Sequence, residues 1–214
     1  MAFFFAFAIK IPMVPFHTRL PEAHVEAPTA GSVISAGILS KMGGYAMIRY
    51  LIPLFYDINS FFIPLIQLLC IIAIIYISLI TITQIDLKKI IAYSSIAHMS
   101  YVVLGIFSSN IYGKIASILI MISHGLISSG LSICTGYSYD RYGTRLLYNY
   151  SNLANFMPIF AIFFFLSILA NTGFPGLNSF IGEFLVLSSI FDNNIIVCLI
   201  ITIFGLLYTT IYCF

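Results

Sequence analysis

The chain has 214 residues, of which 61% are hydrophobic and only 7% are charged, and its mean hydropathy is +1.07. This composition excludes a soluble enzyme and indicates a protein that crosses a membrane several times. The formal net charge of +2 is too small to suggest binding to nucleic acid.

Apolar runs bounded by charged or turn-forming residues predict about seven transmembrane helices. The expected ranges are 2–16, 28–54, 60–83, 88–108, 112–137, 154–190 and 194–213. The expected fold class is therefore an all-α polytopic membrane protein, with no room for a soluble domain. If every helix crosses once, most basic residues lie at one end, which the positive-inside rule assigns to the matrix or cytoplasm. They are Arg19, Lys88, Lys89, Arg141 and Arg145.

Two lysines lie within apolar helix patterns in the first quarter of the chain. Lys10 ends an apolar run, and Pro12 and Pro15 interrupt the helix beyond it because proline cannot donate a backbone hydrogen bond. Lys41 lies about twelve residues into the next helix, hence roughly 18 Å from its start and near the middle of a hydrocarbon core of about 30 Å. A lysine side chain cannot reach water from that depth, so Lys41 indicates function. We expect the two lysines to face each other at similar depth.

The run 154–190 is too long for one straight helix, and the segment TGFPG at 172–176 is expected to break it. This broken helix carries Glu183, just as the first broken helix carries Lys10. Paired Pro/Gly-interrupted segments are typical of inverted-repeat transporters. Each residue also has a simpler interpretation: Lys10 as a terminal lysine that reaches water, and Glu183 as a carboxylate near the outer interface.

Three histidines lie in or next to these apolar helix patterns and are further candidate functional residues. His98 and His124 each lie about ten to twelve residues into their helices, hence near the membrane midplane. The alternative for either ring is a simple hydrogen bond to a neighbouring helix. His17 follows the first helix break and is placed to link Lys10 with Lys41, or with the inner water.

The sequence does not predict a metal site or a disulfide framework. Pro21 interrupts the helical register between the His and Glu residues that follow the first break, and water at the expected aqueous turn would solvate them. These residues are His17, Glu22, His24 and Glu26. The cysteines lie singly in apolar segments without C-x-x-C spacing, at Cys70, Cys134, Cys198 and Cys213.

Several segments resemble the proton-translocating, antiporter-like membrane subunits of respiratory complex I, and among them the family of NADH dehydrogenase subunit 4. They cover nearly the whole chain and read FAIKIPMVPFHTRLPEAHVEAPTAGSV, ILSKMGGYAMIR, DLKKIIAYSSIAHMSYVVLGI, MISHGLISSGL, YDR and LANTGFPGLNSFIGEFLVL. One position departs, because Arg19 stands where this family usually has Trp, and the chain contains no Trp. We interpret this as a change in the aqueous turn that leaves the buried lysines undisturbed.

The resemblance implies proton transfer along a midplane row of Lys10, Lys41, His124 and Glu183, bridged by water. Burial disfavours a protonated lysine and a nearby carboxylate favours it, so movement of a carboxylate makes a lysine a switchable proton donor. The family couples this transfer to remote electron transfer from NADH to ubiquinone, so no flavin, iron–sulfur or quinone cofactor is expected in this chain. The expected location is the mitochondrial inner membrane, with a bacterial plasma membrane as the alternative.

Each inverted repeat of this family has five helices. Residues 1–54 would then hold the last two helices of the first repeat, and residues 55–214 the complete second repeat. The implied partners are lipid and other complex I membrane-arm subunits. The family's lysine-modulating glutamate lies on a helix outside these seven. We therefore expect a separately encoded chain to supply the missing N-terminal helices, the competing account being a longer natural chain.

Two other functions stay open at this point. One is a cation/proton antiporter subunit, which Glu183 argues against because antiporters and the sister subunits usually carry Lys there. The other is a non-pumping structural piece of the membrane arm. The joint presence of Lys10, Lys41, His124 and Glu183 argues against the second alternative.

Overall fold

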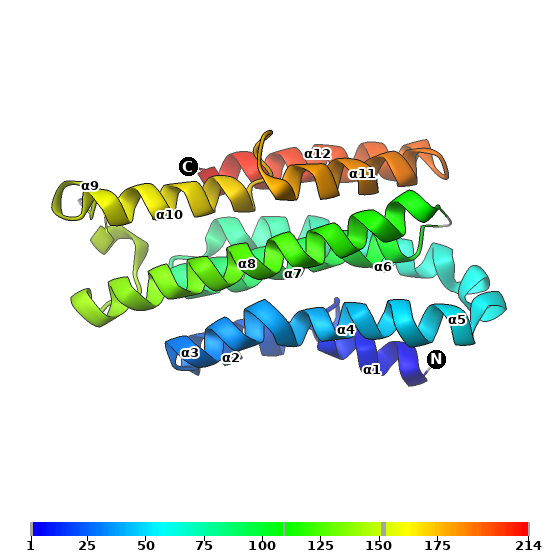
Figure 1. Cartoon of the computed structure of the whole chain (residues 1–214), viewed down its shortest axis with the longest axis horizontal. Helices are drawn as coiled ribbons and strands as arrows, with labels where there is room; N and C mark the ends of the chain where they lie inside the picture. Colours follow the sequence, from blue (N-terminus) through cyan, green and yellow to red (C-terminus); the bar gives the residue numbers. More distant parts are fainter. Residues whose placement is uncertain (1, 109, 151–152, 214) are drawn as a thin grey trace.

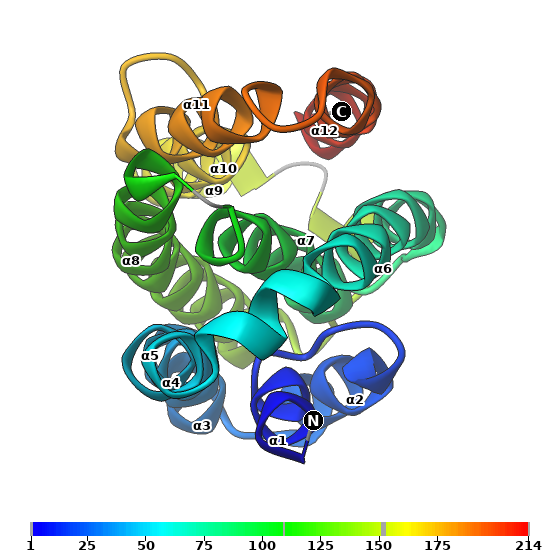
Figure 2. The same ribbon diagram turned by 90° about the vertical axis from the view of Figure 1, so that its right-hand side faces the viewer.

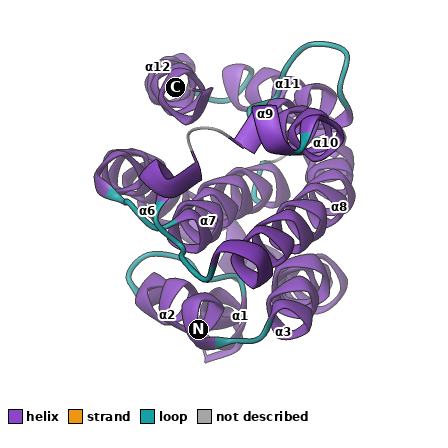
Figure 3. Ribbon diagram, turned by 90° about the vertical axis from the view of Figure 1, so that its left-hand side faces the viewer, coloured by secondary structure: helices purple, strands orange, loops and turns teal. Residues whose placement is uncertain are grey.

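The computed structural model describes residues 2–108, 110–150 and 153–213. These residues form helices joined by loops (Figure 3), and their one bridge of β type pairs Asp86 with Leu146. The long helices lie side by side along the long axis of the molecule (Figure 1). The α-helices are α1 (Ala2–Lys10), α2 (Arg19–Glu26), α3 (Thr29–Ile34), α4 (Ser40–Ala46), α5 (Ile52–Leu54), α6 (Tyr56–Thr83), α7 (Leu87–Ile106), α8 (Ile111–Tyr142), α9 (Leu153–Phe156), α10 (Pro158–Asn171), α11 (Asn178–Phe191) and α12 (Ile195–Cys213).

Three of these helices, α6, α7 and α8, are by length and composition long and apolar enough to cross a bilayer. The stretch 29–54 is also continuous, because α3, α4 and α5 are joined by two π-helical segments, η2 (Ser35–Leu39) and η3 (Met47–Leu51). At 1.5 Å per residue this stretch is about 39 Å long, enough for a further crossing. The apolar helices α10 and α11 follow each other as the two halves of a broken helix, and α12 follows them. The predicted all-α, multi-pass fold is confirmed.

The first predicted helix differs from the expectation of 2–16. Helix α1 ends at Lys10, and after a short loop the chain forms a 3-10 turn, η1 (Phe16–Thr18), followed by α2. The expected aqueous turn is therefore wrong in part, because α2 continues along the long axis beyond the break (Figure 1). Arg19 opens this helix instead of lying in a turn. The segment from α1 to α2 is thus a broken helix, as is the pair α10 and α11.

Helix α7 forms the centre of the bundle. Figure 2, which looks along the bundle, shows it enclosed by α6, α8, α11, α12 and the segment α1 to α5. Nearly all its side chains from Ile91 to Ile106 are buried. Small residues allow the close packing: the Cβ of an alanine at Gly105 would lie 2.7 Å from the carbonyl oxygen of Gly113 on α8. The interior of the bundle holds apolar side chains together with small hydroxyls, and any charged group within it requires a specific partner.

Four basic residues, Lys88, Lys89, Arg141 and Arg145, lie at one end, where the α6–α7 turn meets the end of α8 and the loop after it. The backbone N–H of Leu87 donates to the carbonyl of Arg145 at 3.2 Å, which joins the two loops. Two cations cap the end of α2: Lys88 Nζ donates to the Ala27 carbonyl at 3.0 Å, and the Arg145 guanidinium donates to the Val25 carbonyl at 2.8 Å. Cations at a helix C-terminus satisfy its free carbonyls and favour its dipole. By the positive-inside rule this is the inner end of the bundle.

Candidate functional site

Lys41 donates from Nζ to the carbonyl oxygen of Ala36 at 2.5 Å. That carbonyl is available because η2 is π-helical: the backbone N–H of Ser40, its partner in an α-helix, bonds to the Ser35 carbonyl instead. The hydroxyls of Ser40 and Ser128 also donate to the Ala36 oxygen, at 3.2 Å and 3.3 Å. Three side chains from two helices therefore converge on one main-chain oxygen. This arrangement gives the lysine a fixed partner within the apolar bundle.

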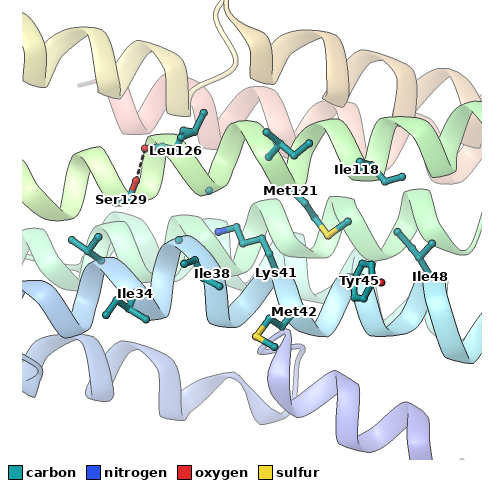
Figure 4. Close-up of a pocket in the computed structure, with 14 residues that line it drawn as sticks. Ile34, Ile38, Lys41, Met42, Tyr45, Ile48, Ile118, Met121, Leu126 and Ser129 are labelled. Carbon is teal, nitrogen blue, oxygen red and sulfur yellow. Dashed lines mark hydrogen bonds between the residues drawn. The ribbon is translucent and has the colours of Figure 1, made fainter.

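A groove of about 860 Å³ separates the stretch 29–54 from α8, and Lys41 lies within it (Figure 4). Its other lining side chains are mostly apolar, among them Ile38 and Ile122. The two helices approach closely at a pair of glycines, since a Cβ at Gly125 would lie 3.2 Å from the Gly37 carbonyl and 3.8 Å from Lys41 Cε. Gly125 thus leaves the space that the lysine stem crosses.

Lys10 lies against the same helix as Lys41. A Cβ at Gly43 would lie 3.1 Å from the Cβ of Lys10 and 2.6 Å from Cγ1 of Ile11. Gly43 is two residues beyond Lys41, so the two lysines lie at similar depth, as their spacing predicts. Two residues correspond to roughly 200° around a helix, so Lys10 lies against another face than the one that carries Lys41, and the expectation that the two side chains face each other is not met. Lys10 itself is exposed on the surface of the described chain, whereas Lys41 is partly buried.

Glu183 and the two predicted midplane histidines form one cluster. His98 Nδ1 lies 3.1 Å from Glu183 Oε1, and both side chains are largely buried. The ring of His98 lies 4.8 Å, centroid to centroid, from that of His124, at an interplanar angle of 33°. Lys41 packs against α8 beside His124, since its Cε would lie 3.8 Å from a Cβ at Gly125, the next residue, so the lysine comes next in the series. His98 thus lies between His124 and Glu183, a position that its spacing in the sequence could not reveal.

The break between α10 and α11 packs directly on the carboxylate of Glu183. Gly173 has φ +70°, and a Cβ there would lie 2.7 Å from Glu183 Oε2. The same break lines a cavity of about 420 Å³ together with Glu183, His98 and Tyr101. The broken helix therefore brings its backbone to the acid and leaves room beside it.

His17 lies elsewhere in the bundle. It is buried, and its ring packs edge-on against Tyr76 of α6 at 5.5 Å. Its Nδ1 is buried without a hydrogen-bond partner in the part of the chain that the structure describes. The predicted role of His17 as a link between the lysines stays a prediction.

Sequence reasoning passed over His24, assigning it to a solvated turn. The structure buries it on α2, where Nε2 lies 3.4 Å from the Ser35 hydroxyl, at the start of η2. The Ser32 hydroxyl donates to the carbonyl of His24 at 3.3 Å. His24 therefore stands between the basic end and the segment that holds Lys41.

Buried hydroxyls continue from His124 toward the inner end on one face of α8. They belong to Ser128, Ser132, Thr135 and Ser138. Each is spaced three or four residues from the next, so that they share one side of the helix. The signal was present in the sequence as a run of small polar residues, which resembles a simple helix-packing face.

Among the described residues, no group of three or more His, Cys, Asp or Glu side chains could hold a metal ion. The arrangement instead offers titratable groups in series across four helices: Lys41, His124, His98 and Glu183. Groups of this kind can pass protons when water or a short movement connects them.

A family model described as NADH:quinone oxidoreductase/Mrp antiporter, TM, matches residues 1–209. The NADH-ubiquinone oxidoreductase chain 4 of Acanthamoeba castellanii is 54% identical over 211 residues, which are 99% of this chain and 42% of that protein. The protein of the same name from Chondrus crispus is 59% identical over 194 residues, or 91% of this chain and 39% of its own. The chain thus spans about two fifths of the length of these curated relatives.

Two solved structures share the fold. A chain of respiratory complex I from Thermus thermophilus with bound NADH superposes with a TM-score of 0.93 at 29% identity, covering 99% of this chain and 45% of that one. A chain of the Mrp complex from Dietzia sp. DQ12-45-1b gives a TM-score of 0.91 at 23% identity, covering 98% of this chain and 39% of that one.

Proposed function

The chain belongs to the NADH:quinone oxidoreductase/Mrp antiporter membrane family, and we propose that it is a proton-translocating membrane-arm subunit of NADH:ubiquinone oxidoreductase, respiratory complex I. It is similar over nearly its whole length to proteins named NADH-ubiquinone oxidoreductase chain 4 from an amoeba and a red alga. These relatives are eukaryotic, which supports the mitochondrial inner membrane as its location. Electron transfer from NADH to quinone occurs elsewhere in the complex, and this chain moves protons.

One observation carries the proposal: titratable side chains follow one another from Lys41 through His124 and His98 to Glu183 inside the bundle. Insertion of a charged lysine at mid-membrane depth costs roughly 2.5–3.5 kcal/mol on insertion scales, so a lysine at this depth is expected to have a functional role. In the proposed route Lys41 exchanges a proton with Lys10 on one side and with His124 on the other. His98 then carries the proton between His124 and Glu183.

Access from the inner end follows the buried polar groups on α2, α3 and α8. His24 and the hydroxyls of Ser32 and Ser35 connect the inner half of the first broken helix to η2. The hydroxyls along α8 run from the same end to His124. Serine and threonine hydroxyls both donate and accept hydrogen bonds, so they can line a chain of water molecules.

The two halves of the chain support the proposed division at residues 54 and 55. In residues 1–54 a broken helix, α1 and α2, is followed by one continuous helical stretch. In residues 55–214 the broken pair α10 and α11 is likewise followed by one helix, α12. Repetition of this pattern is expected for two inverted repeats, the first represented here by two helices.

The exposed face around Lys10 requires a cover within a membrane, because a lysine facing lipid at this depth is unfavourable. We propose that further helices of the same subunit, on a separate polypeptide, pack there and bring a glutamate to Lys10. The relatives are more than twice as long as this chain, which supports further helices but leaves open the chain that carries them. Cross-linking from Lys10 followed by mass spectrometry identifies the polypeptide in contact. Other membrane-arm subunits and lipid are its remaining proposed partners.

The test is Lys41→Met in the assembled complex, with Lys89→Met as the matched control. Lys89 lies at the inner end, where it pairs with Asp86 at 3.4 Å, outside the proposed route. We expect NADH-driven proton uptake by inverted membrane vesicles to fall about a hundredfold for Lys41→Met, as is typical when a proton-transfer group is removed. The control should pump normally, and native gels should show assembled complex in both. Normal pumping by an assembled Lys41→Met complex would remove this lysine from the route.

A further inference from the structure

A second groove, of about 580 Å³, lies between α8 and α10 at the inner end of the bundle. Its walls are apolar and include Ile133, Phe160 and Phe163, and Arg141 closes its inner end. Ile133 and Phe163 are 58% and 65% exposed, so the groove opens to the outside of the described chain. None of the proposed proton-transfer residues lines it.

One cationic and three aromatic side chains contact one another in a row at this groove. The guanidinium carbon of Arg141 lies 4.9 Å from the centre of the Tyr137 ring, and the Tyr137 ring lies 5.5 Å from that of Phe160. Phe160 in turn stacks on Phe164 at 6.0 Å. The contact with Tyr137 turns Arg141 along α8 toward the groove.

The depth of these residues matches the two parts of a phospholipid. Helix α8 extends from Ile111 to Tyr142, about 48 Å, and so exceeds a hydrocarbon core of about 30 Å. Its last turns therefore reach the headgroup region, where Tyr137 and Arg141 are typical interfacial residues. Phe163 lies about one and a half turns beyond the start of α10 at Pro158, hence roughly 8 Å deeper, among the acyl chains.

The charge around Arg141 favours an anion. No carboxylate of the described residues lies within ion-pair distance of its guanidinium. We propose that this groove binds one anionic phospholipid of the inner leaflet, with its phosphate on Arg141 and an acyl chain along Ile133 and Phe163. Basic pockets between transmembrane helices on this side of a membrane suit such headgroups.

The absence of tryptophan from the chain allows a direct test. A single Phe163→Trp in the full chain, reconstituted in bilayers, reports contact with brominated lipids by fluorescence quenching without background. Leu79→Trp is the control, because Leu79 is also exposed near the inner end but lies on α6, away from the groove. Each variant is measured with brominated cardiolipin and with brominated phosphatidylcholine, in the presence and absence of Arg141→Gln.

We expect Phe163→Trp to show about fivefold preference for cardiolipin over phosphatidylcholine, the factor equivalent to about 1 kcal/mol for one basic residue near the surface. The preference should disappear with Arg141→Gln, persist with Arg141→Lys, and weaken as salt is raised. The Leu79→Trp control should show no preference. Equal quenching by both lipids at position 163, or a preference that survives Arg141→Gln, would overturn the proposal.

Discussion

Replacement of Gly173 by alanine is expected to displace the carboxylate of Glu183. The new Cβ would lie 2.7 Å from Glu183 Oε2, closer than carbon and oxygen atoms can approach, so the side chain must move. Its present position is the one that brings Oε1 to 3.1 Å from His98 Nδ1. Gly143 supplies a matched control, because its φ of +65° is close to the +70° of Gly173 and a Cβ there meets no atom within 4 Å.

The two substitutions separate a backbone effect from a contact effect. Alanine in the left-handed region costs roughly 1–2 kcal/mol at either position. Only Gly173→Ala also disturbs the bond between His98 and Glu183, and a hydrogen bond to a charged group contributes about 1.5–3 kcal/mol. At about 1.4 kcal/mol for each factor of ten, the paired arrangement should become about ten- to more than a hundredfold less populated in Gly173→Ala alone.

The assay compares NADH-driven quinone reduction and proton uptake in membrane vesicles that carry either variant. Both variants should lose a similar amount of thermal stability, since they share the backbone effect. Only Gly173→Ala should lose turnover and proton uptake together, by about tenfold or more. Equal activities of the two variants would refute the reasoning that the position of Glu183 depends on the glycine at the break.

Three other predictions, each with a paired variant for comparison, test further parts of the structure. Glu183→Gln should slow turnover with coupled proton release, whereas Glu183→Asp should retain part of both, because only a titratable group passes a proton; equal rates would leave Glu183 a structural role. Ser128→Ala removes one of the three donors to the carbonyl that binds the lysine and should lower proton uptake several-fold, about 1 kcal/mol, whereas Ser129→Ala, whose hydroxyl bonds only within its own helix turn, should pump normally. Gly136→Ala places a Cβ 2.2 Å from a side chain of α3 and should lower the melting temperature, whereas Gly130→Ala has open space and should raise it; the opposite order would contradict the packing.

The sequence predicts the broken helix near its C-terminal end well, because Gly173, Pro175 and Gly176 interrupt an apolar run that is too long for one crossing. The observed break between α10 and α11 includes all three. The first break is predicted less completely. The chain between Lys10 and Pro28 contains three prolines and several charged residues, which resembles a solvated turn. Contacts from the start of α7 and from the loop after α8 stabilise the end of α2, and the composition of this segment does not reveal them.

The residues of the candidate site were also only partly predictable from the sequence. The depth of Lys41, His98, His124 and Glu183 follows from counting residues along helices, since each residue advances a helix by a fixed length. Their order does not follow from that count, because it depends on how α7, α8 and α11 are rotated about their axes. The π-helical turn at Ser35–Leu39 is likewise absent from the sequence pattern, since it shifts hydrogen bonds by one residue without any marked change in composition.

The two hydrogen bonds at the inner end of α2 restrict the amino-acid type of their donor residues more than that of their acceptor residues. Lys88 and Arg145 donate to main-chain oxygens, at Ala27 and Val25. Every amino acid provides such an oxygen, so these bonds do not depend on which side chains occupy positions 25 and 27. The other end of each bond requires a side chain that can reach and donate, and a long cation does this best because it also offsets the negative end of the α2 dipole. Random substitution followed by selection for assembled protein should therefore leave positions 88 and 145 basic while positions 25 and 27 vary, although all four take part in the same two contacts.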